Sequence, residues 1–125
     1  MRALLIDDSS TMRSILRMIL RKAGFETFEA GNGEEGLRQL ELHGVMDLAL
    51  VDWNMPAMNG FEFVCKVREN AAYAQMCIVM VTTETEFSQM QTALAHGANE
   101  YIMKPFTKES VLDKLLLLGM VPQTL

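Results

Sequence analysis

The sequence has few cysteines, and this excludes several kinds of site. Its two thiols, Cys65 and Cys77, lack C-x-x-C spacing, and His43 and His96 lie far from both along the chain. Disulfide scaffolds and zinc sites need cysteines or histidines clustered at short spacings, so neither is indicated. We expect the two thiols to be ordinary buried or surface side chains.

Basic charge and long apolar runs are also scarce. The 11 Lys and Arg residues are outnumbered by 16 Asp and Glu, and the formal net charge is -5 at pH 7. Without a basic tail or block, general binding to nucleic acid or to an anionic membrane is not expected. The first apolar run, in "MRALLIDDSS", is too short for a secretory signal or a membrane span. We therefore expect a cytoplasmic protein whose partners are proteins or small ions.

The remaining composition is that of one globular domain. The chain has 125 residues, of which 50% are hydrophobic and 22% are charged. That length suits a single core. No repeat, low-complexity segment or linker interrupts it. The sequence predicts one domain over residues 1–125, with a core of about 2–118 and a short C-terminal tail.

Strand and helix patterns alternate along the chain. Apolar runs predict five strands, at residues 3–6, 25–30, 47–51, 77–81 and 100–103. Segments with helical spacing follow each strand. The clearest is an amphipathic helix that ends near Gly24 and is expected to turn Arg13, Arg17 and Arg21 toward solvent. Uninterrupted apolar strands alternating with helices predict a parallel sheet covered on both faces, a three-layer α/β sandwich.

Polar side chains stand where these strands end. They are Asp7 and Asp8 after the first strand, Asp52 after the third, Thr82 and Thr83 after the fourth, and Lys104 after the fifth. Open parallel sheets bind ligands beyond the carboxyl ends of their strands, so we expect these side chains to converge. Singly, each could be a cap, a turn residue, strand filler or a solvated charge. Their coincidence at four strand ends favours a site.

Three carboxylates in one pocket require a cation. Two of them about 4 Å apart repel by roughly 4 kcal/mol at an effective dielectric near 20. Oxygen ligands without nearby Cys or His suit Mg²⁺, with Mn²⁺ as a second possibility. A carboxylate can also act as a nucleophile and form an aspartyl phosphate, with a metal, a lysine and a hydroxyl neutralising the charge. The sequence predicts a site for phosphate and a divalent metal.

Four segments together resemble the receiver domain of two-component response regulators. They are "IDDSSTMR", "VDWNMPAMNGFEF", "MVTTETE" and "YIMKPFT", in this order across nearly the whole chain. The likeness is greatest to the stand-alone chemotaxis regulators of that family. It implies a flavodoxin-like (βα)5 fold with sheet order 2-1-3-4-5. It also implies a phosphorylation-activated signalling switch, not an enzyme with its own substrate, which receives its phosphoryl group from a histidine kinase or a small phosphodonor.

The resemblance assigns a role to each residue of the predicted site. Asp52 would be the phosphoacceptor, and Lys104 and Thr82 would contact the phosphoryl group. The Mg²⁺ ligands would be Asp7, Asp8, Asp52 and the backbone carbonyl of Asn54.

The resemblance also implies a switch. Thr82 would move toward the phosphoryl group and Tyr101 would turn inward, which would remodel the face made by the fourth helix, fifth strand and fifth helix for a downstream protein target. Asn54 and Glu84 would set the rate of hydrolysis. The bond before Pro105 would be cis and would aim the lysine inward. Thr83 stands where the family usually has a small alanine, and its bulk is expected to hinder the inward turn of the tyrosine.

Other functions fit parts of the pattern. One is a stand-alone phosphorelay regulator of the same family. Another is an aspartate-nucleophile phosphatase, although such enzymes place a DxD motif on their first strand and here Asp7 and Asp8 are adjacent. A third is a flavodoxin-like cofactor binder, whose flavin phosphate the acids after the first strand would repel.

The last predicted helix, "SVLDKLLLLGM", is apolar over most of its circumference. Its leucines are either extra core, with a hydrophobic tail folding back, or a docking or dimer surface. We expect a monomer or a weak dimer.

Overall fold

The computed structural model describes residues 1–83 and 88–120. Its strands are β1 (Arg2–Ile6), β2 (Glu26–Ala30), β3 (Leu48–Asp52), β4 (Cys77–Thr82) and β5 (Glu100–Met103). Its helices are α1 (Ser10–Lys22), α2 (Gly33–His43), α3 (Gly60–Arg68), α4 (Met90–Ala95) and α5 (Lys108–Leu117), with a 3-10 turn η1 (Ala71–Tyr73).

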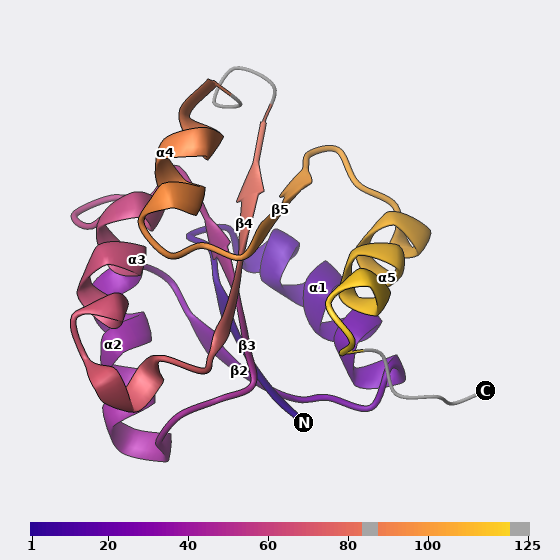
Figure 1. Cartoon of the computed structure of the whole chain (residues 1–125). Coiled ribbons are helices and arrows are strands. Elements are labelled where there is room, and N and C mark those ends of the chain that lie inside the picture. The colour runs from indigo at the N-terminus through magenta and orange to yellow at the C-terminus, as the bar shows by residue number, and fades with distance from the viewer. Residues whose placement is uncertain (84–87, 121–125) are drawn as a thin grey trace.

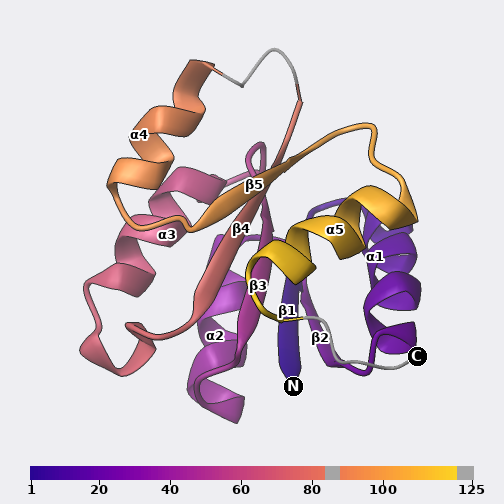
Figure 2. The same cartoon turned by 45° about the vertical axis from the view of Figure 1, so that its right-hand side comes forward.

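The strands form one parallel sheet in the order β2-β1-β3-β4-β5. Helices α2, α3 and α4 cover one face, and α1 and α5 cover the other (Figures 1 and 2). The predicted three-layer, flavodoxin-like (βα)5 fold and its strand order are confirmed. The predicted strand bounds differ from the observed ones by one residue at most.

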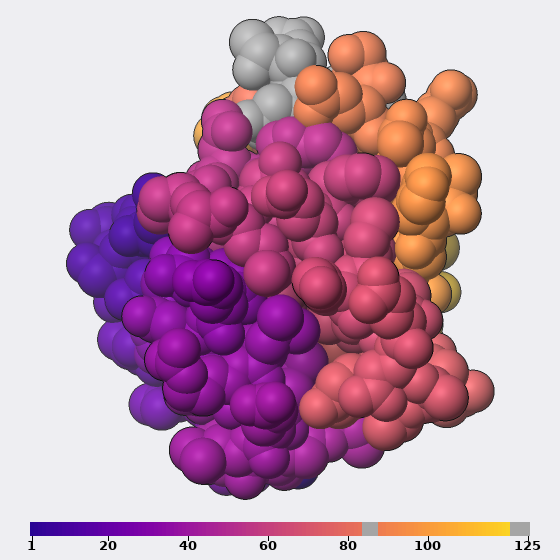
Figure 3. Space-filling view, turned by 90° about the vertical axis from the view of Figure 1, so that its left-hand side faces the viewer, coloured from indigo at the N-terminus to yellow at the C-terminus, as the bar shows by residue number. Residues whose placement is uncertain are grey.

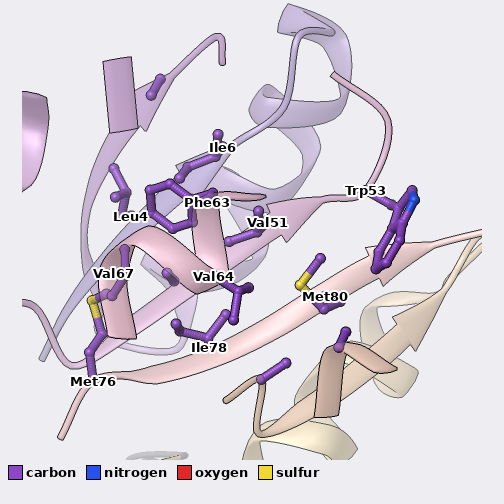
Figure 4. Close-up of a cluster of buried hydrophobic side chains, with 14 of the residues drawn as sticks. Leu4, Ile6, Val51, Trp53, Phe63, Val64, Val67, Met76, Ile78 and Met80 are labelled. Atoms are coloured by element: carbon purple, nitrogen blue, oxygen red, sulfur yellow. The ribbon is translucent and has the colours of Figure 1, made fainter. Parts of the chain in front are cut away.

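Each face of the sheet has its own hydrophobic core. Successive residues of a strand point to opposite faces, so Leu4 and Ile6 of β1 pack beneath α2 and α3, whereas Leu5 packs beneath α1 and α5. Phe63 of α3 is fully buried and lies close to Leu4 and Ile6 (Figure 4). The central strand β3 is buried along its whole length, which explains its unbroken apolar run.

Helix α1 begins at a capping serine. The Ser9 hydroxyl accepts a hydrogen bond from the Met12 amide at 3.2 Å. The cap is therefore Ser9 and not Asp8, which leaves the Asp8 carboxylate available to the edge of the sheet. At the other end of the helix, Gly24 has φ +96°, as expected of a residue that terminates a helix in the left-handed region.

The prediction that the α1 arginines face solvent is wrong for two of them. Arg13 Nε lies 3.1 Å from Glu29 Oε1, and the guanidinium of Arg17 pairs with the other oxygen of the same carboxylate. Their side chains are 20% and 32% exposed. The reason is tertiary: α1 packs beside the edge strand β2, and Glu29 of that strand projects toward the helix. Arg21 is exposed, as expected.

The leucines of α5 divide into two groups. Leu115, like Val111, is fully buried, whereas Leu116 and Leu117 are 65% and 78% exposed. These two leucines lie outside the core formed by the described residues. The tail that was expected to fold back, residues 121–125, lies outside the described residues. No helix in the described part of the chain combines the length and apolar character of a membrane span.

Candidate functional site

Three acidic side chains meet at the carboxyl edge of the sheet. Oxygen atoms of Asp7, Asp8 and Asp52 lie within 4.8 Å of one another. Ile6 and Val51 are register partners on neighbouring parallel strands, and this pairing places the following residues, Asp7 and Asp52, side by side. Asp7 and Asp52 are buried, at 2% and 6% exposure, and Asp8 is exposed. The predicted convergence is observed.

Lys104 reaches this acidic pocket from the loop after β5. Its Nζ donates a hydrogen bond to Asp52 Oδ1 at 3.0 Å and lies 3.5 Å from Asp7 Oδ2. The backbone amide of Lys104 donates to the Thr82 carbonyl at 2.6 Å, which ties the loop to the end of β4. The Lys104–Pro105 peptide bond is cis. One ammonium group therefore serves two buried carboxylates.

The two carboxylate oxygens of Asp7 differ in their hydrogen bonding. Asp7 Oδ1 accepts a hydrogen bond from the Ser9 amide at 2.8 Å. Asp7 Oδ2 is buried and accepts no hydrogen bond from the part of the chain that the structure describes, although Lys104 Nζ is near. A buried anionic oxygen left in this way is costly unless a cation approaches it. Together with an all-oxygen donor set, it shows that these residues fit a hard divalent cation such as Mg²⁺.

The pKa values of the pocket reflect burial opposed by pairing. The pKa of Asp52 is raised to about 6. Burial is the main cause, the hydrogen bond from Lys104 opposes it, and the neighbouring charge of Asp7 adds to the rise. Burial alone would lower the pKa of Lys104, but the hydrogen bond and charge of Asp52 outweigh it and hold that pKa above its ordinary value. The protein alone therefore stabilises the ionised carboxylate of Asp52 less well than water does.

The backbone at Asp52 is clamped by its neighbours. The Trp53 amide donates to the Val81 carbonyl at 3.1 Å, and the Gly60 amide donates to the Trp53 carbonyl at 2.9 Å. A Cβ at Gly60 would stand 2.5 Å from the Asp52 carbonyl oxygen, so only glycine allows α3 to begin this close to the strand. Asn54 lies exposed at the start of the loop between these anchors.

Thr82 ends β4 beside the pocket and is fully buried. Its hydroxyl donates to the Thr83 carbonyl at 3.3 Å. Thr83 is half-buried. Glu84, the other residue predicted to affect hydrolysis, lies outside the described residues.

Tyr101, the other predicted switch residue, is half-buried on β5. Lys114 Nζ of α5 lies 4.8 Å from the centre of its ring. On the other side, the tyrosine lines a groove of about 440 Å³ together with Ser88, Met90, Gln91 and Leu94. Tyr101 therefore lies between α4 and α5.

One residue of the site was missed from the sequence. The guanidinium of Arg13 donates to the Asp7 backbone carbonyl while its Nε pairs with Glu29. It thereby braces the loop that carries Asp7. The signal that could have indicated it is its place in the first turn of the helix that follows the two aspartates.

Comparisons with known proteins agree with this geometry. Residues 3–116 match the family described as Response regulator receiver domain. The chemotaxis protein CheY1 of Helicobacter pylori is 41% identical over 116 residues, which cover 92% of this chain and 94% of that protein. A CheY homolog of Campylobacter jejuni is 44% identical over 116 residues, with 92% and 89% covered. The solved structure of the chemotaxis response regulator CheY4 of Vibrio cholerae has a TM-score of 0.86 at 37% identity and covers 94% of this chain and 97% of that one. The chain therefore belongs to the response regulator receiver domain family.

Proposed function

We propose that this protein is a phosphorylation-activated switch of a two-component system, in which Asp52 accepts a phosphoryl group from a histidine kinase in a Mg²⁺-dependent reaction. The observation that carries the proposal is the buried Asp52 carboxylate, 3.0 Å from Lys104 Nζ and grouped with the oxygens of Asp7 and Asp8. No separate catalytic activity on a substrate is proposed.

The metal ligands would be Asp7, Asp8, Asp52 and the backbone carbonyl of Asn54, with Mn²⁺ able to replace Mg²⁺. When bound, the metal would supply the positive charge that offsets the carboxylates and the phosphoryl oxygens. The buried oxygen of Asp7 that accepts no hydrogen bond from the described residues supports this assignment.

The chemistry at Asp52 follows from its surroundings. With a pKa of about 6, its carboxylate is mostly ionised at neutral pH and can attack phosphorus. An O–P bond forms as the P–N bond to the kinase phosphohistidine breaks, and the departing imidazole keeps the electron pair. Lys104 holds its ammonium beside the attacked carboxylate, where it would stabilise the charge on the transferred group. Asn54 and Glu84 would influence how fast water later removes that group.

The output would be a changed surface at α4, β5 and α5. Thr82 would bind the phosphoryl group and Tyr101 would turn inward, provided that the phosphoryl group binds the active arrangement better than the inactive one. The half-buried Thr83 beside Thr82 would resist that turn. Relatives that carry the name chemotaxis protein favour a chemotaxis target over the alternative, a stand-alone phosphorelay regulator.

Trp53 offers a direct test because it adjoins Asp52 and is 9% exposed. Acetyl phosphate, or BeF₃⁻, added with Mg²⁺ should change its fluorescence in the wild type and leave Asp52→Asn unchanged. Intact-mass analysis after acetyl phosphate should show one phosphoryl group in the wild type and none in the variant. An unchanged wild type, or an equal response in the variant, would overturn the proposal.

A further inference from the structure

A second groove lies between the first turn of α2 and helix α3, and Tyr101 is not among its lining residues. Figure 3 shows the face of the molecule that carries these two helices. The groove has a volume of about 300 Å³, at the lower end of the range typical of ligand pockets. Its apolar lining consists of Ala57, Met58, Phe61 and Cys65. A space of this size and character accommodates one or two apolar side chains of a partner.

The base of this α2–α3 groove is fixed by close packing. A Cβ at Gly33 would stand 2.8 Å from Met58 Sδ, so Met58 packs directly on the backbone of the first turn of α2. The ring of Phe61 is tilted by 30° against that of Trp53, with ring centres 6.0 Å apart, and meets the ring of His96 edge-on at 5.1 Å. The apolar lining is therefore held in place by the fold, and a partner would not need to order it.

Acidic side chains surround this apolar base. Glu34, Glu62 and Glu69 line the groove and are exposed, and Lys66 contributes the one positive charge among the lining residues. The Glu62 carboxylate is engaged by the Asn59 amide at the start of α3, which leaves Glu34 and Glu69 to face a partner. This rim repels nucleic acid and anionic lipid and attracts a basic group.

We propose that the α2–α3 groove binds a segment of a partner protein that carries an apolar side chain of leucine or phenylalanine size flanked by Lys or Arg. The apolar side chain fills the space over Met58, Phe61 and Cys65, and the flanking cations pair with Glu34 and Glu69. Both the burial and the charge complementarity are needed, because rim ion pairs alone contribute little affinity. The proposal does not depend on Asp52 chemistry, so it can fail or hold independently of the proposed function.

Cys65 allows the test to report on the groove itself. The probes are a panel of short synthetic peptides with one Leu or Phe between lysines, and a matched panel in which Ser replaces the apolar residue. At saturating peptide, the rate of Cys65 alkylation by iodoacetamide should fall at least fivefold, while that of Cys77, outside the groove, stays unchanged. The serine panel should protect neither thiol.

Charge-reversal variants separate this site from general attraction to an acidic protein. The double variant Glu34→Lys, Glu69→Lys should weaken binding of the best peptide at least tenfold. The control Glu26→Lys, Asp113→Lys makes the same change in net charge at exposed positions outside the groove and should weaken binding less than threefold. Unfolding midpoints confirm that both variants are folded. Equal weakening in the two variants, or a panel in which no peptide protects Cys65, would overturn the proposal.

Discussion

Two cationic side chains bridge loops at opposite edges of the sheet, and they differ in how fully they are paired. Lys104 lies at the carboxyl edge, where its ammonium is shared between Asp52 and Asp7. Arg68 lies at the other edge, where its guanidinium joins the segments that precede β4 and β5. One is surrounded by excess negative charge and the other by neutral acceptors.

Arg68 makes a nearly complete set of hydrogen bonds. It donates to the carbonyls of Gly97, Tyr73 and Met76 at 3.0, 2.8 and 2.7 Å and to Asn99 Oδ1 at 3.0 Å. The planar guanidinium holds several donors in one fixed geometry, which a lysine cannot imitate. Around Lys104, by contrast, a buried oxygen of Asp7 accepts no hydrogen bond from the described residues. Arg68, with its donors paired, stabilises the fold. The pocket around Lys104 keeps a buried carboxylate oxygen that a bound cation would stabilise.

The largest effect is expected at Asp52, in the acidic pocket at the carboxyl edge of the sheet. Asp52→Asn should abolish phosphoryl incorporation from acetyl phosphate, because the amide cannot act as the nucleophile. Its urea unfolding midpoint should be no lower than that of the wild type, since the substitution removes one of three clustered negative charges. Phosphorylation is followed by intact mass, with Asp113→Asn on α5 as an unaffected control. A variant that is still phosphorylated would place the acceptor elsewhere.

The next largest effect is expected at Arg68, at the opposite edge of the sheet. Arg68→Ala should lower the free energy of unfolding by about 2–4 kcal/mol, because the carbonyls of Gly97 and Met76 lose the Arg68 donor. The Tyr73 carbonyl and Asn99 Oδ1 would each lose one of two donors. Arg68→Lys should restore less than half of this loss. Urea titrations measure both, and Arg38→Ala, at an exposed position of α2, should cost less than about 0.5 kcal/mol. Full rescue by lysine would contradict the view that the planar guanidinium of Arg68 is needed to hold these hydrogen bonds.

A smaller change in the free energy of unfolding should show how much the clustered carboxylates destabilise the metal-free protein. Asp8→Asn should raise the free energy of unfolding by about 1 kcal/mol in metal-free buffer, because it relieves repulsion at an exposed position. It should also reduce the stabilisation that Mg²⁺ gives the wild type. Thermal unfolding with EDTA and with Mg²⁺ tests both parts, and Asp113→Asn should respond to Mg²⁺ as the wild type does.

The smallest effect concerns Glu29, which is paired with the α1 arginines. Burial favours a higher pKa, but the hydrogen bonds and charges of Arg17 and Arg13 outweigh it and hold the Glu29 pKa below its usual value. A lowered folded-state pKa gives stability that is present above the unfolded pKa and is lost as pH falls through the folded value. Glu29→Gln should therefore cost up to about 1 kcal/mol near neutral pH. The difference from the wild type should shrink below about pH 4.5, and a difference independent of pH would contradict the ion-pair account.

Much of the fold and the polar edge could be predicted from the sequence because both follow local rules. The apolar run before Asp52 marks a strand buried on both faces, and parallel strands bring their carboxyl ends to one edge. That was enough to predict that Asp7, Asp8, Asp52 and Lys104 converge, as the structure shows.

The remaining features depend on contacts between distant segments. Arg13 and Arg17 occupy the polar face of α1, and only the placement of α1 beside β2 pairs them with Glu29. The hydrogen bonds of Arg68 join residues up to 31 positions away. The α2–α3 groove depends on Met58 packing against Gly33. Helical periodicity describes one helix at a time and contains no information about such neighbours.

The contact between Gly60 and the Asp52 carbonyl has a consequence for engineering. Because the Gly60 amide closes the loop onto the Trp53 carbonyl, residues 54–59 form a closed bulge on a fixed base. Exposed side chains of that bulge, such as Pro56, can be substituted without displacing the strand beneath it, whereas the proposed metal ligand Asn54 and the α3 cap Asn59 constrain its length. At Gly60 itself, even the methyl group of an alanine would collide with the Asp52 carbonyl oxygen. Sequence changes in this loop can therefore accumulate a few residues from the Asp52 carboxylate without moving it.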